Sequence, residues 1–91
     1  MKRLLSTRKD RETAKLIRRL EAMTNEIKAI SEAIELADRC FNEVDDSDLT
    51  EALIYDRSAL LARYSYLIKE VKKLEGEIAS AKDFFNSHKN A

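Results

Sequence analysis

The sequence predicts an all-α protein that folds as an antiparallel two-helix hairpin. Two long segments repeat apolar residues at alternating intervals of three and four, which is the spacing of a helix with one apolar seam. A short acidic stretch separates them, and the 91 residues include one glycine and no proline. Long helices have this composition, whereas loop-rich chains do not. Each seam is therefore expected to pack against the other.

The first helix is expected from about residue 8 to residue 44. Its seam consists of Leu16, Leu20, Met23, Ile27, Ile30, Ile34, Ala37, Phe41 and Val44. A second apolar strip lies beside this seam and consists of Ala29, Ala33, Leu36 and Cys40. One partner helix cannot cover both strips, so the second one favours a bundle of more than two helices.

The turn is expected at residues 45–48, which read Asp-Asp-Ser-Asp. Aspartate and serine favour turns because their side chains bond to nearby backbone groups. Asp48 is followed three residues later by Glu51, which is the pattern of a capping box. The sequence therefore predicts Asp48 as the N-cap of the second helix.

The second helix is expected from about residue 49 to residue 88. Its seam consists of Leu53, Leu60, Tyr64, Leu67, Val71, Leu74, Ile78, Ala81 and Phe85, and a further strip beside it consists of Ile54, Leu61 and Ile68. Arg57 also occupies a seam position, opposite Ala37, where a small neighbour leaves room for its aliphatic part. We expect Arg57 to pair with Asp38 or Glu35.

The chain length favours self-association of this single domain. A chain of this size buries only about 60% of the surface that its unfolded form exposes, so a lone hairpin would be marginally stable. We expect a homodimer in which two hairpins form a four-helix bundle. The residues expected at the interface are Ile54, Leu61 and Ile68 with Ala29, Ala33 and Leu36.

Charge is balanced overall but divided along the chain. The 17 basic and 17 acidic residues cancel. Residues 1–19 contain eight basic and two acidic side chains, residues 20–56 contain two and eleven, and residues 57–91 contain seven and four. The hairpin is thus expected to have an acidic turn and a basic open end. The simplest interpretation is that these charged side chains lie on solvent-exposed faces and bind nothing.

Three binding interpretations of this charge pattern stay open. The oppositely charged ends can attract each other and align hairpins head to tail or antiparallel. The basic end can hold the phosphates of nucleic acid or of an anionic membrane. Its candidate residues are Arg8, Arg11, Lys15, Arg18 and Arg19. The acidic turn, with Asp45, Asp46 and Asp48, can bind a basic partner, or act as an inhibitor that mimics nucleic acid.

Catalytic, metal and cofactor motifs are weak. His88 is the only histidine, so Glu-x-x-His metal pairs do not occur. A calcium loop starting at Asp46 would need glutamate where Arg57 stands. One glycine cannot form a Gly-rich phosphate loop. The sequence predicts no enzymatic activity and no cofactor or metal.

Cysteine usage and hydropathy predict a cytoplasmic protein. Cys40 is the only cysteine, which suits a reducing compartment because an internal disulfide needs two. No apolar run approaches the roughly 18 residues of a membrane helix. The first residues begin like a signal peptide, but charged side chains interrupt them before an apolar segment develops.

Part of the second helix resembles a known family. The matching pieces are Ile54-Tyr55-Asp56, Ala62-Arg63-Tyr64 and the six residues from Leu67 to Lys72. In this segment the chain is similar to the YaaL-like family of small bacterial proteins of unknown function. The resemblance implies a bacterial cytosolic setting and brings no catalytic residues.

The function expected from the sequence is a non-enzymatic protein-interaction module that self-associates. It would act as an adaptor or a small regulator of another, unidentified protein. The alternatives are nucleic-acid or anionic-membrane binding by the basic end, and inhibition by the acidic turn.

Overall fold

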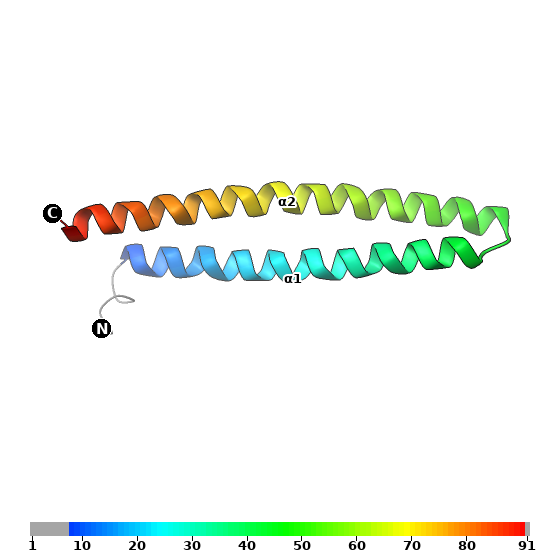
Figure 1. Cartoon of the computed structure of the whole chain (residues 1–91), viewed down its shortest axis with the longest axis horizontal. Helices are drawn as coiled ribbons and strands as arrows, with labels where there is room; N and C mark the ends of the chain where they lie inside the picture. Colours follow the sequence, from blue (N-terminus) through cyan, green and yellow to red (C-terminus); the bar gives the residue numbers. More distant parts are fainter. Residues whose placement is uncertain (1–7, 91) are drawn as a thin grey trace. The chain divides into compact units, whose positions relative to one another are not determined.

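The computed structural model describes the backbone of residues 8–90 and the side chains of residues 10–83. Two helices account for nearly all of it: α1, Arg8–Glu43, and α2, Ser47–Asn90. They form an antiparallel hairpin, as the sequence predicts (Figure 1). No strand occurs in residues 8–90. The side chains of Arg8, Phe85 and His88 lie outside the described residues.

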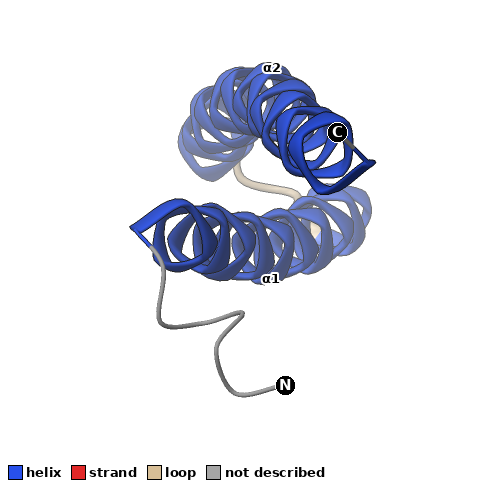
Figure 2. Cartoon of the chain, turned by 90° about the vertical axis from the view of Figure 1, so that its left-hand side faces the viewer, coloured by secondary structure: helices blue, strands red, loops and turns tan. Residues whose placement is uncertain are grey.

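The hairpin consists of two compact units. The terminal unit comprises Met1–Thr24 and Glu70–Ala91, and the turn unit comprises Asn25–Lys69. Within each unit, a segment of α1 lies beside a segment of α2 and runs in the opposite direction (Figures 1 and 2). The turn unit therefore contains the connection, and the terminal unit contains the start of α1 and the end of α2.

The core of each unit consists of seam residues. Ile30, Ala37 and Leu67 are buried in the turn unit, and Leu74 and Ile78 are buried in the terminal unit. All five occupy seam positions, so the heptad pattern identifies the packed faces. Burying a leucine or isoleucine side chain contributes about 1.5–3 kcal/mol, which makes these positions the main source of hairpin stability.

The connection between the helices consists of residues 44–46 and is capped by Asp46. Oδ1 of Asp46 accepts a hydrogen bond from the backbone N–H of Leu49 at 3.0 Å. The backbone carbonyl of Asp46 accepts one from the N–H of Thr50, also at 3.0 Å. This is the geometry of an N-cap. The prediction that Asp48 is the N-cap was therefore wrong.

The helix boundaries differ slightly from those expected. α1 ends at Glu43 instead of residue 44, and α2 begins at Ser47 instead of residue 49. Asp48 thus lies in the first turn of α2, where a negative charge favours the helix dipole. α2 continues to Asn90, two residues beyond the expected end.

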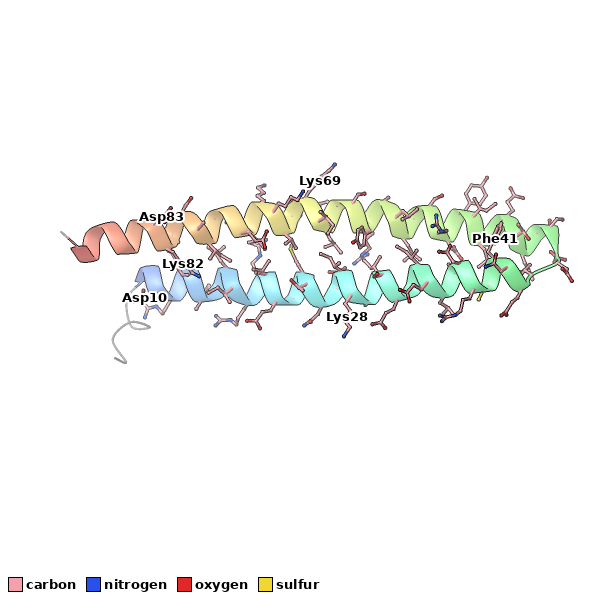
Figure 3. All side chains as sticks on the ribbon, in the orientation of Figure 1. Asp10, Lys28, Phe41, Lys69, Lys82 and Asp83 are labelled. Carbon is pink, nitrogen blue, oxygen red and sulfur yellow. The ribbon has the colours of Figure 1, made fainter. Side chains whose placement is uncertain are left out.

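Two seam positions near the turn are more exposed than predicted. Phe41 is 43% exposed, and the Arg57 side chain is 44% exposed. Ala37 is too small, and Arg57 too polar, to fill the space between the two helices beside Phe41. The apolar layer is consequently open beside Phe41, whose ring lies on the side of α1 that faces α2 (Figure 3).

Candidate interaction surfaces

Large apolar side chains are exposed in the turn unit. Seven such side chains are exposed among the described residues, and all of them lie in Asn25–Lys69. They are Leu36, Phe41, Leu49, Ile54, Tyr55, Leu61 and Tyr66. Single exposed apolar residues are normal, whereas a contiguous apolar patch is typical of an interaction surface.

Two ion pairs join α1 and α2 in the turn unit. Arg57 Nε donates to Asp38 Oδ1 at 2.6 Å, and Arg63 Nε donates to Glu26 Oε2 at 2.9 Å. Arg63 donates to the same oxygen through Nη2 as well. In heptad notation Arg57 is at a and Asp38 at e, whereas Arg63 and Glu26 are both at g.

The heptad positions of these pairs place them on opposite sides of the seam. Positions e flank a and positions g flank d, and in an antiparallel pair e meets e and g meets g. We call the two sides the Arg57 face and the Arg63 face. Lys28 and Lys69, which are at b and f, point away from the facing helix (Figure 3).

The Arg57 face contains the apolar strip of α2, which consists of Ile54, Leu61 and Ile68 and is called the α2 strip. All three occupy e positions beside the seam. Ile54 is 49% exposed, Leu61 is 39% exposed and Ile68 is half-buried. Ile54 and Leu61 are therefore uncovered in the single chain, and their coverage by a second copy stays a prediction.

A groove of about 310 Å³ adjoins this strip. Phe41 from α1 and Ile54 from α2 line it, together with both members of the Arg57–Asp38 pair. Ala37 contributes only a methyl group, which leaves the space open. The groove thus combines apolar walls with one ion pair.

The Arg63 face contains the apolar strip of α1, and its residues Ala29, Ala33 and Leu36 are called the α1 strip. These residues occupy c and g positions, on the side of d. Leu36 is 53% exposed, Ala29 is exposed and Ala33 is half-buried. The sequence-based interface combined this strip with the α2 strip. Because the strips lie on opposite faces, one two-fold contact between hairpins covers only one of them.

Basic side chains gather on α1 in the terminal unit. Arg11, Lys15, Arg18 and Arg19 are all exposed. Arg11, Lys15 and Arg18 follow at intervals of four and three, which aligns them along one side of the helix. The terminal unit contains twelve basic and seven acidic residues, and the turn unit five and ten, so their net charges are +5 and −5.

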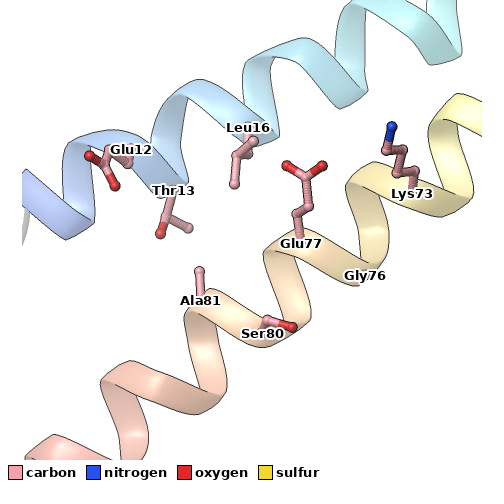
Figure 4. Close-up of a pocket in the computed structure, with 8 residues that line it drawn as sticks. All are labelled: Glu12, Thr13, Leu16, Lys73, Gly76, Glu77, Ser80 and Ala81. Atoms are coloured by element: carbon pink, nitrogen blue, oxygen red, sulfur yellow. The ribbon is translucent and has the colours of Figure 1, made fainter.

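The terminal unit also contains a groove of about 700 Å³. Thr13 and Ala81 lie at seam positions but are small, so the layer between the helices is incompletely filled (Figure 4). Glu12, Lys73 and Glu77 line the groove as well. Sequence reasoning did not identify this groove, although a threonine and an alanine at seam positions were a signal for it.

The acidic turn has a structural role in addition to its charge. Asp45, Asp46 and Asp48 are exposed. The Asp46 carboxylate caps α2, so its presence is explained by helix stability. The interpretation of the turn as a nucleic-acid mimic stays a prediction.

The described residues were found to contain neither a metal-binding cluster nor a membrane-spanning helix. No cluster of three or more histidine, cysteine, aspartate or glutamate side chains suited to a metal ion occurs in that part of the chain. Cys40 is a half-buried free thiol. Neither helix, within the residues that the structure describes, is long and apolar enough to cross a membrane.

Comparisons of the chain with protein-family models, with curated proteins and with solved structures find no match. The similarity of residues 54–72 to the YaaL-like family therefore stays a prediction.

Proposed function

We propose that this chain is a non-enzymatic protein-interaction module that self-associates. The observation that supports this function is the position of the exposed large apolar side chains, all seven of which lie in the turn unit of the described chain. Apolar strips on two faces suit an adaptor, because one face can bind a second copy while the other binds a partner. The single cysteine favours a reducing compartment such as the cytoplasm.

Self-association is assigned to the α1 strip. Its alanines let a second helix approach closely, and small residues pack well against large ones across an interface. In an antiparallel two-fold contact, Ala29 of one copy lies opposite Leu36 of the second. The same register brings Glu26 opposite Arg39, an exposed cation of opposite charge. Two hairpins joined in this way form a four-helix bundle.

Like charges oppose binding of a second copy at the α2 strip. Exposed carboxylates of Glu35, Asp38 and Glu51 flank it. A two-fold contact between two Arg57 faces would bring these acidic groups near their own copies, and like charges facing each other oppose association.

Sedimentation velocity tests the proposal directly. We expect the unmodified chain to form dimers at tens of micromolar. Leu36→Glu should yield monomers, because it places a charge within the apolar contact, opposite Ala29 of the second copy. Tyr55→Glu is the matched control, since Tyr55 is 66% exposed and points outward at an f position. A strictly monomeric unmodified chain would contradict self-association.

Phosphate binding by the terminal unit is a second candidate function. The exposed stripe of Arg11, Lys15 and Arg18, with Arg19 next to it, favours it. It predicts retention on heparin that weakens steeply with salt. Arg18→Glu with Arg19→Glu should abolish retention, while Lys28→Glu with Arg39→Glu, the same charge change in the turn unit, should not. Absence of retention at low salt would eliminate this function.

A further inference from the structure

The α2 strip has the spacing of a helix-binding surface. Ile54, Leu61 and Ile68 recur at intervals of seven residues on one side of α2. They extend over about 21 Å at the usual rise per residue. A helix laid along the strip would meet one apolar residue per heptad, as in other helix-in-groove complexes.

The groove next to Ile54 supplies an anchoring point at one end of this strip. Its volume of about 310 Å³ is open to the Arg57 face and is bordered by the exposed ring of Phe41. One large apolar side chain of an occupant would displace water from these walls. Burial of apolar area in such a pocket is the usual anchor of an interface.

Charge specifies the kind of helix that this surface accepts. Residues 38–56, which form the turn and both adjoining helix ends, contain seven acidic residues and one basic residue. Asp45 and Glu51 are exposed here, and Asp38 is paired with Arg57. An occupant with basic side chains beside its apolar ones would be attracted, whereas a second acidic face would be repelled.

We infer that the Arg57 face of the turn unit binds a basic amphipathic helix of a partner protein. The inference rests on the proposed function as an interaction module and names the chemistry of its partner. The bound helix places apolar residues at i, i+7 and i+14 on the α2 strip, with the one nearest the turn in the groove. Lysine or arginine residues beside its turn-proximal apolar residue lie opposite the carboxylates near Ile54.

A pair of synthetic peptides tests this specificity. The first contains three heptads with leucine at the apolar positions and lysine beside them, and the second carries glutamate in place of each lysine. Fluorescence anisotropy should show that the lysine peptide binds, more weakly as salt rises. The glutamate peptide should bind at least about tenfold more weakly. Equal binding of both peptides, or binding of neither, would overturn the inference.

Variants on the two faces locate the binding surface. Ile54→Ser with Leu61→Ser should weaken binding of the lysine peptide by about tenfold or more, since both removed side chains lie in the contact. The matched control, Ala33→Ser with Leu36→Ser, changes the opposite face and should leave binding unchanged. If only the control pair weakens binding, the peptide occupies the Arg63 face and the assignment is wrong.

Charge reversal provides a test that leaves the core intact. Asp45→Lys with Glu51→Lys changes two exposed residues. This double substitution should remove the preference for the lysine peptide over the glutamate peptide. If the preference persists, the exposed carboxylates are not its cause. Sedimentation without peptide reports on self-association separately. A monomer that binds the lysine peptide through the α2 strip would refute self-association while supporting the present inference.

Discussion

Arg57 donates a hydrogen bond from Nε to Oδ1 of Asp38 at 2.6 Å, from a heptad position at which an apolar side chain is expected. The two side chains are 44% and 50% exposed. The pair therefore stays largely in water and avoids the desolvation cost of a buried ion pair. Because exposed pairs contribute only about 0–1 kcal/mol, Arg57 adds little to stability.

Arg57→Leu should consequently stabilise the hairpin. Leucine would lose the weak ion pair but would continue the seam beside Ala37 and Leu53. The apolar gain should exceed the electrostatic loss by about 1 kcal/mol. Thermal unfolding followed by circular dichroism should show a rise in melting temperature of roughly 4–8 °C for a chain of this size.

Arg63→Leu is the control for this substitution. Arg63 also pairs across the helices, with Glu26, but its g position flanks the seam and its side chain is 64% exposed. Leucine there would bury less surface, so the melting temperature should change little. A lower melting temperature for Arg57→Leu would show that the Arg57–Asp38 ion pair stabilises the hairpin more than an apolar side chain at position 57 does.

The seams could be predicted from the sequence because heptad spacing depends only on helix geometry. Ile30, Leu67 and Leu74 lie at predicted seam positions and are buried. The N-cap could not be assigned in the same way. Asp46, Ser47 and Asp48 are all good capping residues, so local preference does not rank them. The choice depends on where α1 ends, and the N–H of Val44 still bonds to the carbonyl of Cys40.

Asp46→Ala should destabilise the hairpin more than Asp48→Ala. The first substitution removes the acceptor of the Leu49 N–H and should lower the free energy of unfolding by about 1 kcal/mol. The second removes a favourable charge in the first turn of α2, worth about 0.3–1 kcal/mol at low salt. Urea unfolding of both variants at low and high salt distinguishes them. The Asp46 effect should persist at high salt, and the opposite order of effects would contradict the observed cap.

Buried and exposed leucines of α2 should differ strongly in their contribution to stability. Leu67 is 4% exposed, and Leu67→Ala should cost about 2–5 kcal/mol because it leaves a cavity. Leu61 is 39% exposed, so Leu61→Ala should cost less than about 1 kcal/mol. Chemical unfolding of the two variants measures the difference. Similar losses would mean that Leu61 is covered in solution, as expected if a second copy binds the Arg57 face.

The division of the apolar strips between two faces was harder to predict than their existence. The sequence shows that Leu36 and Leu61 both lie outside the seam. Which face each one occupies depends on the register and direction of the opposite helix, which the Glu26–Arg63 and Asp38–Arg57 pairs reveal. The groove beside Phe41 depends on Ala37 and Arg57 meeting across the seam, a juxtaposition that the heptad pattern does predict.

Gly76→Ala should stabilise the terminal unit. Gly76 lies inside α2, and a Cβ added there would meet nothing within 4 Å. Glycine in a helix costs roughly 0.5–1 kcal/mol relative to alanine, because it gives up more backbone freedom on folding. Circular dichroism should therefore show a higher melting temperature, by about 2–8 °C if the hairpin unfolds as one cooperative unit.

The same substitution tests whether the two units unfold together. Ala62→Gly in the turn unit is the reciprocal control, since Ala62 is exposed in the interior of the same helix and should lose about as much stability as Gly76→Ala gains. If both variants shift a single transition in opposite directions, the hairpin unfolds as one unit. If Gly76→Ala shifts only an early part of the transition, the terminal unit unfolds separately. A decrease in melting temperature for Gly76→Ala would contradict the open surroundings of this position.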